Sequence, residues 1–282
     1  MDCTVLHRDV NGAKRSMLKR RGWRIEYSTV VAMAAAIAVV AVAQYLEGAT
    51  GLSLWQPTAA LVVFGGTAAA LFVSYPVALV QRTVRSVMDV FVERPDPTRG
   101  VINDLLVCAH ISRRRGTLAL EPEIERIADP FLGRALGVIV EGTDSTLARQ
   151  LLQGESDART EHDEAPAEVL ETAAGYAPTL GILGAVLGLI RVMQNLDQPG
   201  GFGTGIAVAF VATVYGVATA NLVLLPLATR LRTRARAAAM ARELTIEGVA
   251  GVREGMNPRL LEQKLRGLMV VTDVSRMPQK VA

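Results

Sequence analysis

The sequence is poor in the residues that carry most enzyme chemistry. It holds three histidines, His7, His110 and His162, and two cysteines, Cys3 and Cys108, among 282 residues. These residues are scattered over polar segments and show neither a metal-ligand spacing nor a disulfide framework. Phosphate-binding loops, nucleophile elbows and dinucleotide-binding fingerprints are absent as well. We therefore expect a protein that is not an enzyme and that binds no cofactor or metal.

Acidic side chains are missing from four long apolar stretches of the chain. These stretches are about 27–46, 57–80, 173–193 and 203–228, and Arg191 is their only charged residue. Each is at least as long as the roughly 20 residues that a helix needs to cross a bilayer. Buried core helices of a soluble protein rarely run this long without a charge, so that alternative is disfavoured. The sequence predicts four transmembrane helices.

Lysine and arginine are absent from the two short connectors, about 47–56 and 194–202. By contrast, seven of the 30 basic residues lie in the first 26 residues, eleven lie in 81–172 and eleven lie after residue 228. Basic loops stay on the cytoplasmic side of a membrane, so both termini and the central segment are expected in the cytoplasm. The basic start and first apolar run imitate a signal peptide, but cleavage would remove one span and move the next basic segment outside. We therefore expect an uncleaved, multi-pass protein of the inner membrane.

These patterns predict an all-α membrane protein in five parts. Residues 1–26 form a basic cytoplasmic N-terminal extension, 27–80 hold transmembrane helices 1 and 2, 81–172 form a cytoplasmic helical domain, 173–228 hold transmembrane helices 3 and 4, and 229–282 form a cytoplasmic C-terminal helical tail.

The cytoplasmic parts carry their own helical patterns. Apolar residues between 102 and 111 recur at the spacing of an amphipathic helix, which we expect Gly116 to interrupt. A second helix is expected over 123–152, bent around Pro130. In the tail, Pro258 is expected to open a last short helix.

The predicted spans contain no aspartate or glutamate, although pumps and proton relays usually need a carboxylate there. If the protein moves ions, the titrating carboxylate must come from another chain. The spans offer only hydroxyl and amide groups such as Thr213, and ordinary hydrogen bonding between helices is their simpler interpretation. A secondary transporter would be expected to show related halves around a midplane site, and the two pairs of spans do not look alike.

The third predicted span is interrupted by a proline and by small residues. Gly184 and Gly188 are four residues apart, and Gly181 repeats this spacing with Ala185. Small residues at this spacing let helix backbones pack closely in lipid. Pro178 leaves one backbone carbonyl without its N–H donor, and that carbonyl must face protein or water. We therefore expect one face of this span to be crowded against other protein.

Five segments carry a recognisable pattern: PTAALVVFGGTAAALFVSYP (57–76), RRRGTLALE (113–121), APTLGILGAVLGLI (177–190), GTGIAVAFVATVYGVATANLVLLPLATRL (203–231) and EGMNPRLLEQKL (254–265). Together they resemble the MotA/TolQ/ExbB group of ion-driven motors, and within it the four-span stator subunits of the flagellar motor. The resemblance covers roughly residues 27–269.

The resemblance implies partners. Such subunits assemble as a homopentamer around two copies of a MotB-like chain, whose single span supplies the ion-binding aspartate and whose periplasmic domain binds peptidoglycan. Ion passage would turn the ring, and the cytoplasmic domain would push on the rotor protein FliG.

The resemblance also implies residue roles. By similarity, Pro178 and Pro226 match two prolines tied to torque coupling, and Thr213 matches a hydroxyl near the ion path, which Pro178 also borders. Arg113 and Glu121 match the charged pair that meets the rotor.

Position 185 bears on the identity of the ion. Sodium-driven relatives often carry a hydroxyl there, and Ala185 offers no oxygen ligand. The resemblance therefore implies H+ as the transported ion, although the Thr213 hydroxyl remains available.

Other interpretations stay open from the sequence. A related motor unit could energise a non-flagellar machine, although TolQ/ExbB-type chains usually have three spans and lack the segments at 113–121 and 257–259. Pro226 could merely end the fourth span, and the basic run 113–115 could simply be solvated or face lipid.

Overall fold

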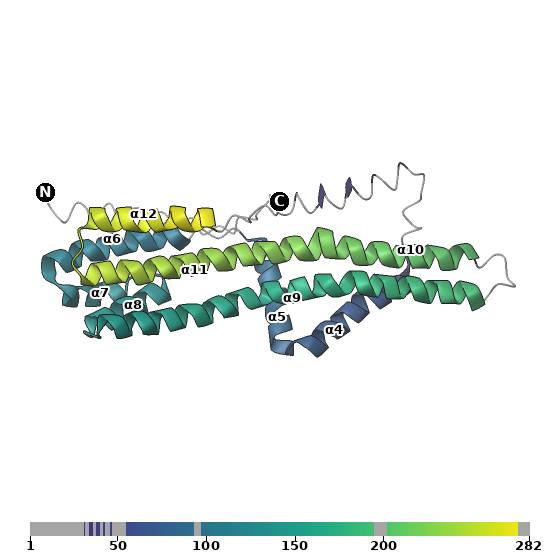
Figure 1. Cartoon of the computed structure of the whole chain (residues 1–282), viewed down its shortest axis with the longest axis horizontal. Coiled ribbons are helices and arrows are strands. Elements are labelled where there is room, and N and C mark those ends of the chain that lie inside the picture. Colours follow the sequence, from purple (N-terminus) through teal and green to yellow (C-terminus); the bar gives the residue numbers. More distant parts are fainter. Residues whose placement is uncertain are drawn as a thin grey trace.

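The computed structural model describes residues 55–92, 97–194 and 202–275, together with isolated helical positions between 31 and 46. Helices joined by short turns make up these residues (Figure 1), which confirms the all-α class for this part of the chain. The predicted N-terminal extension and both short connectors lie wholly or largely outside the described residues. The first predicted span does so except for its isolated helical positions.

Two very long antiparallel helices form the axis of the molecule (Figure 1). The first is α9, Ser145–Gln194, with 50 residues. The second is continuous from α10 (Phe202–Ala218) into α11 (Leu225–Arg253). Between them lies a π-helical turn, η5 (Thr219–Leu224), which we call a wide turn because its hydrogen bonds span five residues. At about 1.5 Å per residue, α9 is roughly 75 Å long, which is far more than a bilayer requires.

Three described helical stretches are long and apolar enough to cross a membrane: Pro57–Ser74, a part of α9, and a part of Gly205–Arg253. They coincide with the second, third and fourth predicted spans. The predicted borders at 172/173 and 228/229 fall inside α9 and α11, so the third and fourth spans run into the polar region without a break.

The stretch at 57–74 consists of α3 (Pro57–Ala60), the wide turn η2 (Leu61–Gly65) and α4 (Gly66–Ser74). Pro57 occupies the start of this helix, where its missing N–H is not needed. Extended backbone at Tyr75 ends α4, and α5 (Val77–Val90) then runs across the two long helices (Figure 1).

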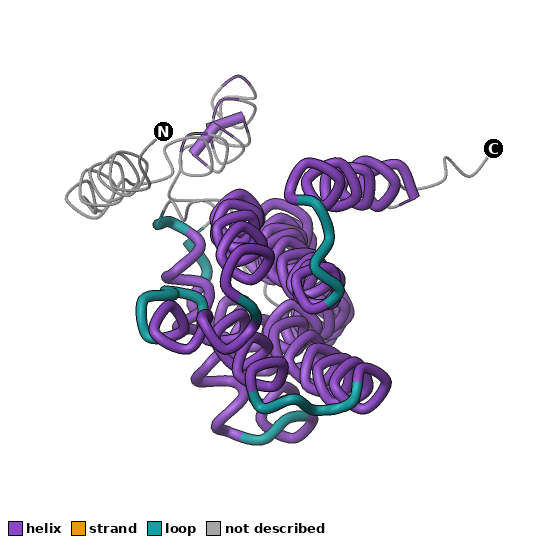
Figure 2. The backbone as a smooth tube through the Cα atoms, turned by 90° about the vertical axis from the view of Figure 1, so that its left-hand side faces the viewer, coloured by secondary structure: helices purple, strands orange, loops and turns teal. Residues whose placement is uncertain are grey.

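The end of the molecule away from the apolar spans is a small helical domain built around α9 and α11. Figure 2 looks along the long helices from this end. The helices added here are α6 (Pro97–Arg115), η3 (Thr117–Leu120), α7 (Glu121–Ile124), α8 (Pro130–Val140) and α12 (Pro258–Ser275). The fully buried leucines of these helices and of α11 share one core, which includes Leu105, Leu132, Leu136, Leu244, Leu261 and Leu265.

Three local predictions for this domain are confirmed and one is wrong. The amphipathic helix exists as α6, Gly116 with φ 83° ends it, and Pro258 opens α12. The single helix expected over 123–152 is instead three pieces, α7, α8 and the start of α9. Asp129 begins α8 because its carboxylate accepts hydrogen bonds from Phe131 N (2.8 Å) and Leu132 N (3.3 Å).

Candidate functional site

The glycines of the third span lie against α10. A Cβ added at Gly181 would lie 2.9 Å from the carbonyl oxygen of Ala212 and 3.4 Å from Thr213 Cα. A Cβ at Gly184 would lie 2.8 Å from Ala212 Cβ, and one at Gly188 would lie 3.0 Å from Ala209 N. All three glycines are buried. The two helix backbones are therefore too close here to admit a side chain on α9.

The partner helix contributes glycines to the same contact. Gly205 packs against the Val192 side chain, and a Cβ at Gly216 would collide with the carbonyl oxygen of Ala177. It would also lie 3.1 Å from the Cα of Pro178, so α10 touches α9 at the position of the proline. The sequence analysis did not single out Gly205 and Gly216, although four-residue spacing links them to Ala209 and Ala212.

Pro178 is half-buried inside the continuous helix α9. The residues around it make local hydroxyl contacts. Thr179 Oγ1 donates to the carbonyl oxygen of Tyr176 (2.8 Å), and the Tyr176 hydroxyl lies 3.1 Å from Ser74 Oγ at the end of α4. The proline turn is therefore joined to the second span through side-chain hydroxyls.

Thr213 lies at the α9–α10 contact beside Gly181 and is half-buried. Its hydroxyl donates to the carbonyl oxygen of Ala209 at 3.3 Å, within its own helix. Ala185 is half-buried on α9, next to Gly184. The structure thus places Thr213, Pro178 and the three predicted glycines along one helix–helix contact, and that contact contains no carboxylate.

Pro226 is exposed in the first turn of α11, directly after the wide turn η5. Leu225 N donates to the carbonyl oxygen of Ala220, five residues earlier, and Pro226 has no N–H to give. The carbonyl oxygen of Asn221 therefore receives neither the N–H of Leu225, four residues later, nor an N–H from position 226, five residues later. Asn221 is exposed, and its side-chain amide donates to the carbonyl oxygen of Val217 (2.9 Å). Sequence reasoning found Pro226 and missed the wide turn before it.

Arg113 and Glu121 lie in the small helical domain at the opposite end from the apolar spans. Arg113 is in the last turn of α6, and Glu121 begins α7. Both side chains are exposed, and neither forms an ion pair within the described part of the chain. The structure therefore leaves both charges available at the surface rather than joined to each other.

An ion-pair cluster on the same domain joins three helices. Glu247 of α11 pairs with Arg149 of α9, and Glu247 Oε2 lies 2.8 Å from Lys264 Nζ of α12. Partial burial acts to raise the pKa of Glu247, but the Lys264 hydrogen bond and the charges of Lys264 and Arg149 outweigh it and lower the pKa below its usual value. This cluster holds the C-terminal helix to the two long helices.

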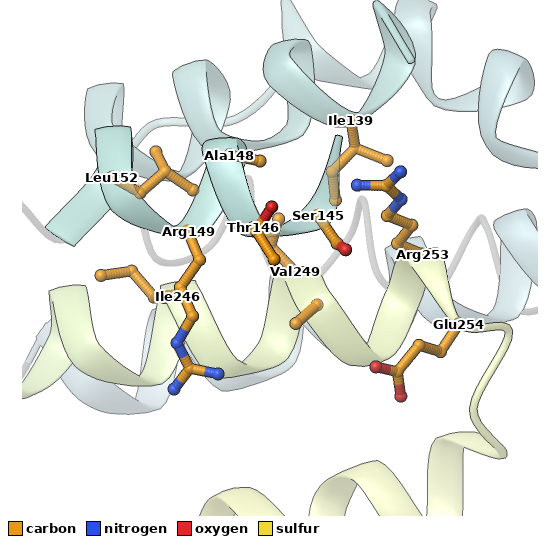
Figure 3. Close-up of a pocket in the computed structure, with 11 residues that line it drawn as sticks. Ile139, Ser145, Thr146, Ala148, Arg149, Leu152, Ile246, Val249, Arg253 and Glu254 are labelled. Carbon is orange, nitrogen blue, oxygen red and sulfur yellow. The ribbon is translucent and has the colours of Figure 1, made fainter. Parts of the chain in front are cut away.

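A pocket of about 530 Å³ opens where α8, α9 and α11 meet (Figure 3). Its walls include Ser145, Arg149, Arg253 and Glu254. Arg149 is engaged by Glu247, and the acidic Glu254 lies at the rim, so the charges here do not converge on one ligand. Over the described ranges, no group of three or more metal-ligating side chains comes together.

In the residues that the structure describes, the chain thus combines three apolar helical stretches that are long enough to cross a membrane with a polar helical domain. This is the architecture of a multi-span helical membrane protein. Residues 123–244 match the model of the MotA/TolQ/ExbB proton channel family. Motility protein A of Bacillus subtilis (strain 168) is 32% identical over 245 residues, which are 86% of this chain and 90% of that protein. The chain belongs to the MotA/TolQ/ExbB proton channel family.

Other relatives agree with this membership. Motility protein A of Treponema phagedenis is 31% identical over 86% of this chain and 93% of that protein. Among solved structures, C. jejuni MotAB aligns with a TM-score of 0.80 at 29% identity, over 86% of this chain and 96% of that chain. The flagellar MotAB stator complex from Bacillus subtilis aligns with a TM-score of 0.79 at 31% identity, over 89% of this chain and 100% of that chain.

Proposed function

We propose that this chain is an ion-conducting stator subunit of the bacterial flagellar motor, which couples proton flow to torque on the rotor. One observation carries the proposal. The predicted spans contain no aspartate or glutamate, yet the chain aligns over nearly its whole length with chains solved as MotAB complexes. A proton path through such spans requires a carboxylate from a second chain. We assign that role to a MotB-like subunit with a single span and a peptidoglycan-binding domain.

The assembly that follows is a homopentamer around two copies of the MotB-like chain in the inner membrane. Both termini and the helical domain lie in the cytoplasm, as the distribution of basic residues predicts. Arg113 and Glu121, exposed at the far end of the molecule, are the proposed contacts to the rotor protein FliG. Contacts of this kind are steered by charge and weaken with added salt.

The proposed cycle begins at the α9–α10 contact. Protonation of the partner aspartate neutralises a charge that is costly inside the membrane, so the aspartate leaves the neighbourhood of Thr213 and steps to the next copy. Pro178 contacts Gly216 of α10, and Pro226 follows the wide turn η5 that precedes α11. Both prolines are therefore placed where a change beside Thr213 would pass into the cytoplasmic helices. Ala185 supplies no oxygen ligand, which favours H+ over Na+.

A clean deletion of the gene tests the function. We expect cells that still build filaments but do not swim, and that recover swimming with the wild-type chain but not with Pro178→Leu. Normal swimming of the deletion strain, with no second stator gene present, would instead assign the chain to a non-flagellar machine. A matched control is Pro57→Ala, because that proline starts a helix where its N–H is not needed.

A further inference from the structure

Helix α5 is fastened to both long helices where the apolar spans give way to the polar domain. At its start, the Tyr75 hydroxyl lies 2.8 Å from Thr172 Oγ1 of α9. At its end, Val90 is fully buried in an apolar cluster with Ala167 of α9 and Leu227 of α11. The helix therefore crosses α9 and α11 and touches both (Figure 1).

One arginine of α11 binds the end of α5. The Arg234 guanidinium donates to three main-chain carbonyl oxygens, those of Asp89 (2.6 Å), Val90 (2.8 Å) and Val92 (2.8 Å). The last carbonyls of a helix have no N–H partner within the helix, and a positive charge there is favourable. The planar guanidinium can reach several acceptors at once, which an ammonium cannot do in the same geometry. We call Arg234 and these three carbonyls the Arg234 anchor.

A second arginine of α11, about two turns beyond Arg234, binds α9. Arg242 is 8% exposed, and its guanidinium donates to Asp163 Oδ2 (3.0 Å) and Thr160 Oγ1 (3.0 Å) of α9. The other oxygen of Asp163 lies 3.9 Å from Arg82 of α5. The Asp163 side chain is 33% exposed, but its loss would leave the buried Arg242 guanidinium without its charge partner, so the pair links α9 to α11 here. The anchor and this pair thus join three helices.

We propose that Arg234 is a positioning residue for force transmission. By binding the end of α5, it makes α5, α9 and α11 one rigid unit beneath the membrane. Movement begun at the α9–α10 contact then reaches the distal domain without being lost to sliding between helices. This inference rests on the proposed stator function and adds a residue that takes part in neither the ion path nor the rotor contact.

The test compares Arg234→Gln with Arg236→Gln in the complete complex with its single-span partner. Arg236 lies two residues further along α11, is exposed, and makes no hydrogen bond or ion pair within the described residues, so it controls for loss of positive charge. Three quantities are measured: the amount of complex in the membrane, proton flux in proteoliposomes, and motor torque at high load in tethered cells. We expect Arg234→Gln to keep wild-type complex and flux but to deliver roughly half the torque or less, because a charge-assisted contact is lost. Arg236→Gln should match the wild type.

Arg234→Lys separates charge from geometry. It keeps the positive charge but reaches fewer carbonyls, so we expect torque between that of wild type and Arg234→Gln, at normal flux. If Arg234→Gln does not accumulate, the same comparison is made with Arg234→Lys alone. Equal torque for the Arg234 and Arg236 variants would overturn the proposal, as would a parallel loss of complex, flux and torque in Arg234→Lys. Wild-type complex that conducts no protons and restores no swimming would refute the stator function itself.

Discussion

At the scale of single residues, the glycines of α10 show how tightly the two long helices approach each other. Gly216 lies against the backbone of α9, where there is no flexible side chain that could move aside. In lipid, such close contact is the main source of attraction between helices, because apolar side chains gain little by leaving the lipid tails.

Gly216→Ala is therefore expected to destabilise the complex. The added Cβ would collide with the carbonyl oxygen of Ala177, and forcing extra volume into a packed contact costs about 1–3 kcal/mol. The measurement is the thermal unfolding of the purified complex in detergent. Gly175→Ala is the control, since Gly175 is exposed on α9 with open space where its Cβ would be. Equal melting temperatures for the two variants would contradict the close contact.

Cys108 makes a second residue-scale prediction. It is 2% exposed on α6, and burial, aided by the charges of Asp104 and Glu123, raises the pKa of its thiol to about 12. Because the thiolate is the reactive form, the folded protein should resist alkylation at pH 8 and lose that protection only on unfolding. Mass spectrometry of a Cys3→Ser variant treated with iodoacetamide measures this directly. Rapid labelling without denaturant would show that this face of α6 is not packed.

At the scale of helices, the sequence predicted what depends on periodicity and missed what depends on local capping. The α6 pattern and the break at Gly116 follow from side-chain spacing and backbone freedom. The break between α8 and α9 was missed, although Gly142, Thr143 and Asp144 between the two helices are poor helix formers. There, Gly142 adopts φ 76°, and the Asp144 carboxylate accepts from Thr146 N (2.9 Å) and restarts the chain as α9. The Asp129-Pro130 pair was the readable signal for the preceding start.

The candidate site was predictable to a similar extent. Pro178 and its neighbouring glycines are visible as a pattern within one segment. Their contact partners Gly205 and Gly216 lie on another helix, and only tertiary packing pairs them. Arg234 and Arg242 look like members of one basic run in the sequence. In the fold they have different partners: Arg234 binds main-chain carbonyl oxygens, whereas the buried Arg242 binds the half-exposed carboxylate of Asp163.

The wide turn η5 carries a prediction of its own. Pro226→Ala restores an N–H that can donate to the carbonyl oxygen of Asn221, five residues earlier, which the proline leaves unpaired, so the wide turn becomes stiffer. A stiffer turn opposes bending between α10 and α11, on which the proposed torque coupling at Pro226 depends. We expect a complex that still assembles but produces little torque, measured as tethered-cell rotation. Wild-type rotation would show that the unpaired carbonyl at the wide turn is not needed.

At the scale of the whole molecule, the charge distribution and the fold make one prediction about topology. Leu118 is 72% exposed in η3, within the domain that the basic residues assign to the cytoplasm. In a Cys3→Ser background, Leu118→Cys should react with a membrane-impermeant maleimide only after the cells are permeabilised. Gln198→Cys, in a connector without basic residues, should react in intact cells. Reaction of Leu118→Cys from outside would reverse the orientation.

The length of α9 has a mechanical consequence. From Pro178 to the helix start at Ser145 it extends about 50 Å as one continuous rod, at 1.5 Å per residue, in which Pro166 removes one backbone hydrogen bond. A tilt of roughly 10° at the proline would swing the far end by about 9 Å, which is close to the diameter of a helix. The rod is thus a lever with a short arm in the membrane and a long arm below it, which exchanges force for distance. Under the proposed function, a small displacement beside Thr213 would become a stroke long enough to move a neighbouring protein by one helix width.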